Sequence, residues 1–448
     1  MRHRSTSWSS FFLFALGLFS ETKVFFLGCV AISELVVFAL APIVFLRNLH
    51  NLRRDGFLGC IYMVFGLMLA LFVSSWYNHT AMPFVVKSFA VMYGVFSFVV
   101  VFYSLLKDNL AGLKWLMIGA ALSLIITIFA FNPTAQVSES GYGYIGATSA
   151  EDVIAGPLFW VSRLNAFVRI PIIGWYYQMP LAYSVIVPFA YVAFVAVTTI
   201  SGRSASLAML AGVFIIAWGR KKRSSMRMIG KHFFLFVFLG GILALMAKEA
   251  YKYAALHDLM GEDARNKYEA QTRKGGGILA LLMSGRTEFF TAIPAAIDNP
   301  IMGYGPHPED TNEYALRYCV KYGDYNDIQA YMYRRQIAMQ MGYRMEIPSH
   351  SQIMGAWIHY GVFGLIFYLY YLGLIVVHLR RYSAAIPQWY GYFALMIPTN
   401  LWNLFFSAFG GRWQFALFIT TLLFARAIGT GRRILPYEME MEARKYDE

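Results

Sequence analysis

A Ser-Gly-Arg triplet occurs twice in this sequence, and its residue types suit the binding of a phosphate group. Ser201 and Arg203 belong to a Ser-Gly-Arg triplet, and Ser284 and Arg286 belong to a second copy, each beside an apolar stretch. Arginine offers phosphate oxygens a rigid fork of donors and keeps its charge, while Ser and Gly let backbone N–H groups approach an anion. Either copy alone is also compatible with an arginine that reaches lipid headgroups. The two copies together favour a binding site for a lipid-linked phosphate.

His350 is the candidate for acid–base chemistry, because it lies where a polar stretch meets the apolar run 353–377. An imidazole has an ordinary pKa of about 6.5 and can accept a proton near neutral pH. Ser351 follows directly, and Gly361 and Gly364 come later in the same predicted helix, where they permit close helix contact. From the residues alone, a histidine at such a boundary is more often a purely interfacial residue than a base.

His307 is a second polar candidate, at the end of a Gly-Tyr-Gly-Pro-His segment. Gly and Pro predict a turn there, and substrate binding is the alternative interpretation. The neighbouring carboxylates are expected to lie on a solvated loop face: Glu309, Asp310, Asp324 and Asp327. The sequence contains no His-Glu-x-x-His motif and no Gly-rich Walker loop. We therefore expect arginines rather than a metal to bind phosphate, and no cofactor.

The composition predicts that these residues are positioned by a membrane bundle. Of the 448 residues, 58% are hydrophobic and 14% are charged, whereas soluble domains carry about 25% charged residues. Apolar runs recur along the chain, and their lengths predict an all-α, polytopic bundle of roughly ten to twelve transmembrane helices. The net charge of +13 lies largely in short segments between apolar runs. This pattern indicates membrane topology and lipid headgroups as partners rather than nucleic acid.

The same pattern divides the chain into four parts. We expect an N-terminal transmembrane bundle over 1–246, a large periplasmic loop subdomain over 247–349, C-terminal transmembrane helices over 350–428 and a cytoplasmic tail over 429–448. Within the loop, 287–297 and 327–341 are predicted to be helical. A polar stretch this long is rarely structureless unless it is functional, so an ordered subdomain is expected.

The motif around His350 resembles the signature of O-antigen ligases. His350-Ser351 is followed after nine residues by Gly361-x-x-Gly364, and the loop before it carries Asn299-Pro300-x-x-Gly303-x-Gly305. The two Ser-Gly-Arg triplets resemble further elements of the same family. The resemblance covers roughly 178–374, and it is most specific at the motif that begins with His350.

This resemblance implies a membrane glycosyltransferase of the bacterial inner membrane, with its active site facing the periplasm. The donor would be a glycan linked to undecaprenyl pyrophosphate, and the acceptor a hydroxyl of the lipid A core. Arg203 and Arg286 would hold the pyrophosphate, and His350 would accept the proton from the acceptor hydroxyl. The reaction would invert the anomeric centre without a metal.

Two alternatives remain open at the level of the sequence. Ligases often carry a leucine four residues after the loop arginine, where this chain has Phe290. Wzy-type polysaccharide polymerases share the plan and the donor, but their acceptor is a growing glycan. A lipid-linked oligosaccharide flippase or other transporter is less favoured, because the sequence shows no repeated halves.

Overall fold

The structure is a computed structural model, and it describes the chain in separate stretches. These are residues 2–20, 23–25, 29–130, 287–322, 325–340, 344–349, 351–382, 385–386, 389–407 and 412–433, with 249, 252–253, 256–257 and 269. The described chain is helical apart from a short antiparallel pair of strands, β1 (Lys23–Phe25) and β2 (Cys29–Ala31). The prediction of an all-α polytopic membrane protein is confirmed.

The N-terminal helices follow the apolar runs closely. Pro83 lies in the first turn of the helix Met82–Leu106. A backbone N–H in that turn has no partner within the helix, so proline costs no hydrogen bond there. In chain order they are α1 (Arg2–Leu18), α2 (Ile32–Arg54), α3 (Leu58–Tyr77), α4 (Met82–Leu106) and α5 (Leu113–Ala130), with a 3-10 turn, η1 (Leu110–Gly112), before α5.

In the described part of the C-terminal half, three loop helices precede three bundle helices. The two helices predicted at 287–297 and 327–341 are confirmed as α15 (Thr287–Asp298) and α17 (Tyr325–Gln340). Between them lies α16 (Tyr314–Tyr322). The bundle then continues with α18 (Gln352–Val377), a π-helical turn η2 (His378–Tyr382), α19 (Tyr390–Phe406) and α20 (Arg412–Gly429).

Four described helices are long and apolar enough to cross a membrane: Ile32–Arg54, Leu58–Tyr77, Met82–Leu106 and Gln352–Tyr382. The expected count of ten to twelve crossings rests partly on residues outside the described stretches, and it stays a prediction. The same holds for the four-part division of the chain.

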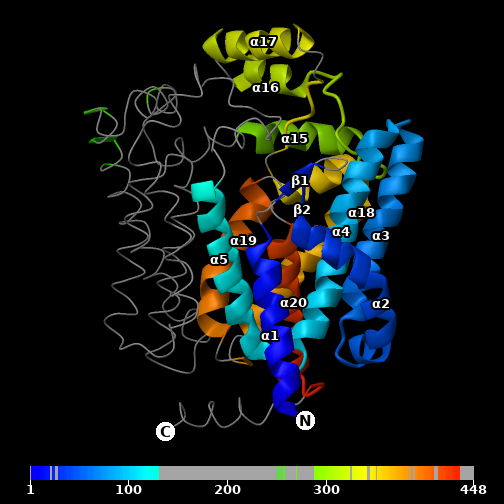
Figure 1. The fold of residues 1–448 in the computed structure, drawn as a ribbon. Coiled ribbons are helices and arrows are strands. Elements are labelled where there is room, and N and C mark those ends of the chain that lie inside the picture. The colour runs from blue at the N-terminus through cyan, green and yellow to red at the C-terminus, as the bar shows by residue number, and fades with distance from the viewer. Residues whose placement is uncertain are drawn as a thin grey trace.

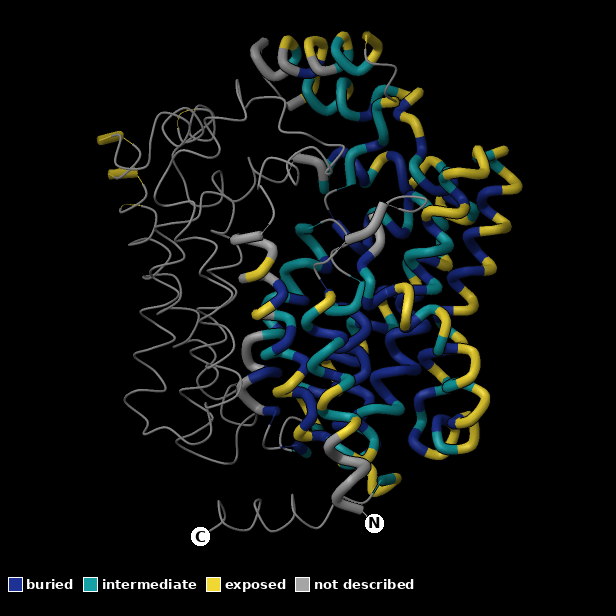
Figure 2. The backbone as a smooth tube through the Cα atoms, viewed as in Figure 1, coloured by how far each residue is buried: buried dark blue, intermediate teal, exposed yellow. Residues whose placement is uncertain are grey.

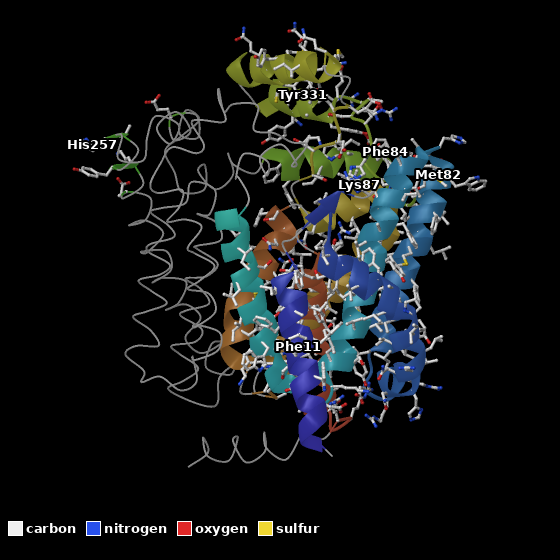
Figure 3. All side chains as sticks on the ribbon, viewed as in Figure 1. Phe11, Met82, Phe84, Lys87, His257 and Tyr331 are labelled. Atoms are coloured by element: carbon white, nitrogen blue, oxygen red, sulfur yellow. The ribbon has the colours of Figure 1, made fainter. Side chains whose placement is uncertain are left out.

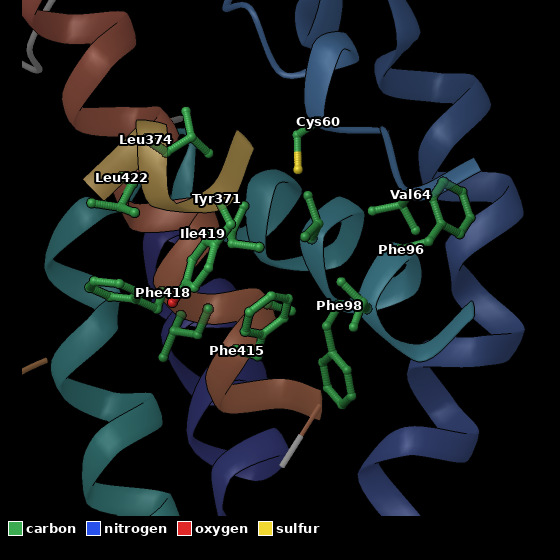
Figure 4. Close-up of a cluster of buried hydrophobic side chains, with 14 of the residues drawn as sticks. Cys60, Val64, Phe96, Phe98, Tyr371, Leu374, Phe415, Phe418, Ile419 and Leu422 are labelled. Atoms are coloured by element: carbon green, nitrogen blue, oxygen red, sulfur yellow. The ribbon is translucent and has the colours of Figure 1, made fainter. Parts of the chain in front are cut away.

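The core lies between α3, α4, α18 and α20, which pack side by side. Aromatic side chains fill much of it (Figure 4). Phe57, Tyr103 and Phe424 meet with ring centroids 4.6–5.6 Å apart, a separation typical of favourable aromatic pairs. Figure 2 shows this buried centre, with exposed residues on the outer sides of α2 and α3. Apolar side chains on such outer faces suit contact with lipid.

The loop helices α15, α16 and α17 form a separate layer at one end of the bundle (Figure 1). α15 contacts α18, and α16 lies between α15 and α17. The opposite end of the bundle holds the turn between α2 and α3 and the end of α20, which an ion pair between Asp55 and Arg433 joins. The two ends of the bundle therefore differ, and the candidate site lies at the loop-helix end.

Candidate functional site

The feature that organises the candidate site is a break in α18 at Gly361. This residue has φ +62° and ψ −151°, which splits α18 into an initial segment and a longer second segment. Side chains other than glycine are almost excluded from this backbone region. A Cβ at Gly361 would also collide with the carbonyl of Ile301. The expectation of one uninterrupted helix is therefore wrong, and the close contact that Gly361 permits is with a loop rather than with another helix.

The segment from Asn299 to Asp310 inserts its backbone into this break. In an unbroken helix the N–H of Val362 would donate to Ile358, but here it donates to the carbonyl of Ile301 at 3.2 Å. The carbonyl of Ile358 accepts instead from the N–H of Tyr304 at 2.7 Å. The loop thus satisfies the backbone groups that the break exposes, as buried backbone requires.

Two further contacts complete this insertion. The N–H of Gly305 donates to the carbonyl of His359 at 3.1 Å. Gly303 adopts φ +67°, and a Cβ there would lie 2.6 Å from the backbone N of Gly361. Gly303 and Gly305 of the Asn-Pro-x-x-Gly-x-Gly segment and Gly361 of the Gly-x-x-Gly pair therefore meet in one contact, although the sequence places them in separate motifs.

Helix α3 contributes two polar side chains from its last turn. Ser74 Oγ donates to the carbonyl of His359 at 2.9 Å, and Asn78 Nδ2 donates to the carbonyl of Gly303 at 3.0 Å. Trp357, on the first segment of α18, donates through Nε1 to the carbonyl of Pro300 at 3.1 Å. We refer to the contact of 299–310 with α18 and with the end of α3 as the loop junction.

His307 lies at the solvent side of the loop junction and pairs with Glu346. Its φ is +53°, so the predicted turn at this position is confirmed. His307 Nδ1 lies 2.9 Å from Glu346 Oε1, and the two side chains are 20% and 26% exposed. The imidazole is 5.4 Å from the ring of Phe84 and 6.2 Å from that of His359, centroid to centroid. Figure 3 shows Phe84 at the loop-helix end of α4.

Short backbone contacts fix the geometry of this pair. The N–H of Asp310 donates to the carbonyl of Met345 at 2.8 Å, and the N–H of Ile347 donates to that of Pro308 at 3.0 Å. Glu309 and Glu346 form an isolated antiparallel bridge. The segments that carry His307 and Glu346 are therefore held side by side by their main chains.

Asp310 corrects one expectation about the loop carboxylates. It is buried rather than solvated, and its two oxygens accept from the N–H groups of Tyr314 and Ala315 at 2.8 and 3.1 Å, which fixes the start of α16. Burial raises the pKa of Asp310, and the two backbone hydrogen bonds oppose that rise. Glu309, by contrast, has a half-exposed side chain, as expected.

Tyr314 joins α16 to the end of α15. Its hydroxyl donates to Asp298 Oδ2 at 2.6 Å and lies 2.8 Å from the hydroxyl of Tyr304. Burial and the bond to Asp298 raise the pKa of Tyr314, so its proton stays in place at neutral pH. The loop helices are thus connected to the loop junction through tyrosine hydroxyls.

The start of α18 is fixed independently, next to the position of His350. Ser351 is buried and caps the helix, since its Oγ accepts from the N–H of Met354 at 3.3 Å and donates to the carbonyl of Leu404 on α19 at 3.0 Å. His350 itself lies outside the described residues, as do Ser201, Arg203, Ser284 and Arg286. Their roles therefore stay predictions.

Within the described part of the chain, no three His, Cys, Asp or Glu side chains gather as a metal site would need. The contacts described above instead involve backbone N–H and C=O groups, the hydroxyl of Ser74, the side-chain amide of Asn78, and the imidazole–carboxylate pair of His307 and Glu346. Such groups can bind and orient a hydroxyl-bearing ligand, since they supply both donors and acceptors.

Comparison with protein families identifies the region that contains these contacts. Residues 188–369 match the O-antigen ligase family. The match confirms the resemblance that the motifs predicted, and it includes the loop 299–310, its partner residues on α18 and all six predicted site residues. No match was found among curated proteins or among solved structures.

The O-antigen ligase match supports a membrane enzyme of the ligase or polymerase type, with a place in lipopolysaccharide biosynthesis. The family also implies a lipid-linked glycan and an acceptor as substrates in general. Several residues of the candidate site were not anticipated from the sequence. Glu346 looked like one loop carboxylate among many, and Ser74 and Asn78 lie more than 200 residues before their partners in the junction.

Proposed function

We propose that this protein transfers a glycan from undecaprenyl pyrophosphate to a hydroxyl of the lipid A core, at the periplasmic face of the inner membrane. The observation that carries this proposal is the O-antigen ligase match, which includes Arg203, Arg286 and His350. The ordered contact between the polar loop and α18 supports it, because a transfer site needs rigid elements to position its groups.

In this reaction the acceptor oxygen attacks the anomeric carbon of the donor sugar, and the bond from that carbon to the pyrophosphate breaks. His350 accepts the hydroxyl proton, which contributes about 10²–10⁴-fold to the rate. Arg203 and Arg286 bind the pyrophosphate, whose negative charge grows as it leaves. Fixed positive charge at that position is the main requirement, since pyrophosphate is already a good leaving group. Direct attack inverts the anomeric centre.

Two features of the described chain support His350 as the base. Ser351, the next residue, is buried and bound both to its own helix and to α19. The loop that leads to His350 is held at Ile347 by Pro308. Proton transfer at a defined distance needs a positioned base, and fixed residues on both sides of His350 in the sequence are in keeping with that need.

The experiment that tests the proposal replaces His350 with alanine in the full-length protein. We expect glycan transfer to fall by at least about 10²-fold while the protein still accumulates in the membrane. Arg286→Lys should also lose most activity, because an ammonium cannot replace the two-pronged contact of a guanidinium. Near-normal transfer by His350→Ala would exclude it as the base, and full activity of Arg286→Ala would place the pyrophosphate elsewhere.

The second candidate function is a Wzy-type polymerase, which uses the same donor. Phe290 favours it, since ligases often carry leucine at that place. Phe290 lies half-buried on α15 beside Phe289, whose ring contacts Phe406 of α19. Deleting the gene separates the two functions. Long glycans left on the carrier lipid identify a ligase, whereas single repeat units identify a polymerase.

A further inference from the structure

The His307–Glu346 pair has a chemistry that the transfer reaction described above does not use. An ionised carboxylate can only accept hydrogen bonds, so the proton in this pair belongs to Nδ1 of His307, which donates to Glu346 at 2.9 Å. In the neutral imidazole the other ring nitrogen, Nε2, then carries a lone pair. No described residue bonds it, and the side chain is 20% exposed. The pair therefore offers an oriented acceptor to a ligand hydroxyl.

The surroundings of this acceptor suit a sugar better than a pyrophosphate. Phe84 supplies an aromatic ring beside His307, and aromatic rings commonly line small-molecule sites next to a few oriented polar groups. Among the described residues, Arg344 brings a positive charge close to Phe84, with its guanidinium 5.9 Å from the ring. Arg344 is already paired with Glu309 at 3.8 Å. Of the described charged side chains near His307, the carboxylates Glu309 and Glu346 therefore outnumber the one guanidinium.

In the sequence, Arg286 of the proposed pyrophosphate site and the loop that carries His307 lie at opposite ends of α15. Arg286 directly precedes α15, a helix of 12 residues, which is about 18 Å long. His307 belongs to the loop that begins beyond the other end of α15. Glu346 lies four residues before His350 in the sequence, so their Cα atoms are at most about 14 Å apart. A short oligosaccharide spans that distance.

We propose that His307, oriented by Glu346 and flanked by Phe84, forms a subsite for a sugar of the acceptor, the core oligosaccharide of lipid A. An acceptor hydroxyl donates its hydrogen bond to Nε2 of His307. The subsite aligns the acceptor while His350 carries out the proton transfer. This inference rests on the proposed ligase function, because it takes the lipid A core as the acceptor.

Binding to the full-length protein in lipid nanodiscs tests the subsite without any need for turnover. The probe is core oligosaccharide released from lipid A, and the comparison ligand is the free O-repeat oligosaccharide. The test variant is His307→Asn, because asparagine tolerates the left-handed backbone at this position while its side chain is too short to replace the imidazole. We expect the Kd for the core oligosaccharide to rise about tenfold, as the loss of one hydrogen bond of ordinary strength predicts.

A matched control and a second variant separate binding from folding. Asn312→Ala removes one side-chain hydrogen bond beside the same loop, the one that Asn312 Nδ2 donates to the hydroxyl of Tyr314 at 3.0 Å, and should leave the Kd unchanged. Glu346→Gln keeps an acceptor oxygen but removes the charge, so we expect a smaller rise of about threefold. The melting temperature of His307→Asn shows whether this variant folds. If it does not fold, the Kd of Glu346→Gln is compared with that of the wild type to test the subsite.

The outcomes discriminate between the proposals. Equal binding of the core oligosaccharide by the wild type, His307→Asn and Glu346→Gln would overturn the subsite, as would failure of the wild type to bind it. If His307→Asn weakens binding of the O-repeat oligosaccharide but not of the core oligosaccharide, the subsite belongs to the donor, and the acceptor assignment is overturned. Transfer assays with His350→Ala report on the proposed function separately, since that variant should lose turnover but keep its affinity for the core oligosaccharide.

Discussion

The two ends of the bundle are held together in different ways. At the loop junction, backbone groups make most of the contacts, and glycines bring the chains close together. At the other end, Asp55 is fully buried and binds Arg54 at 2.9 Å, Arg433 at 2.9 Å and the hydroxyl of Tyr103 at 2.8 Å. We refer to these four side chains as the Asp55 cluster. One end thus relies on backbone geometry, and the other on charge.

The comparison shows why the loop junction suits a binding site. Where main-chain groups provide the stability, side chains such as His307 and Glu346 remain half-exposed and can meet a ligand. In the Asp55 cluster the charged groups satisfy one another, and Arg433 is only 10% exposed. A buried group that already has its partners has little capacity left for a substrate. The following predictions test this division of roles.

The largest effect is expected for Gly361→Ala. The new Cβ would collide with the carbonyl of Ile301, and the φ of +62° is unfavourable for alanine. We expect a loss of more than about 3 kcal/mol in stability, with loss of transfer activity. Gly373→Ala, in the same helix, is the matched control. Its Cβ would meet no heavy atom within 4 Å, and alanine favours helix. Thermal unfolding in detergent measures both, and equal melting temperatures would contradict the break as described.

Asp55→Asn should cost about 3 kcal/mol, because it leaves the buried guanidinium of Arg433 without its charged partner. Unlike Gly361→Ala, it should leave the transfer rate per folded molecule near the wild-type value. Asp108→Asn is the control, since Asp108 also pairs with Arg433, at 3.6 Å, but is 77% exposed. A loss of activity in Asp55→Asn without a loss of stability would show that the Asp55 cluster acts in catalysis.

The Asp55 cluster also predicts a dependence of stability on acid pH. Burial alone would raise the pKa of Asp55, but the hydrogen bonds from Arg54 and Tyr103 and the charge of Arg433 lower it below its ordinary value. The stabilisation is therefore complete above the unfolded pKa of about 3.9, and it is lost as the pH falls below that through the folded pKa. The gap in melting temperature between wild type and Asp55→Asn should narrow below about pH 4. If the gap in melting temperature widened as the pH falls, the pKa of Asp55 would be raised rather than lowered in the folded protein.

The smallest effect is expected for Ser74→Ala, which removes the hydrogen bond to the carbonyl of His359 and a longer one, at 3.4 Å, that Ser74 Oγ accepts from Asn78 Nδ2. That carbonyl keeps its bond from Gly305, so the loss should be about 1 kcal/mol. Ser75→Ala is the control, because Ser75 Oγ is buried without a hydrogen-bond partner among the described residues. Ser75→Ala should be neutral or slightly stabilising. If both variants lose the same stability, the bond from Ser74 contributes nothing measurable.

Much of the fold could be predicted because apolar runs determine which segments form helices. The bounds of α3, α4 and α18 lie within a few residues of the runs 57–76, 84–106 and 353–377. The break in α18 could not be predicted, because the apolar run continues on both sides of Gly361. The hydropathy of a segment carries no information on the backbone angles of a single residue within it.

The candidate site was predicted less completely than the fold. The turn at His307 follows from local Gly and Pro, and it was found. Glu346 is 39 residues from His307, and Ser74 is 285 from His359. No local pattern encodes such pairings, since folding alone brings the segments together. Asp310 was expected in solvent because nothing in its neighbourhood indicates that it caps α16.

The bond from Ser74 to His359 has a consequence for how the protein is made. Its two residues are 285 positions apart, and ribosomes add about 5–20 residues per second. Helix α3 therefore leaves the ribosome on the order of 15–60 seconds before its partner in α18 exists. Throughout that interval the polar end of α3 is in or near the membrane without the groups that complete it. A nascent chain arrested before 359 would contain the described helices α1–α5 and α15–α17 and still lack the loop junction, so the site forms only late in synthesis.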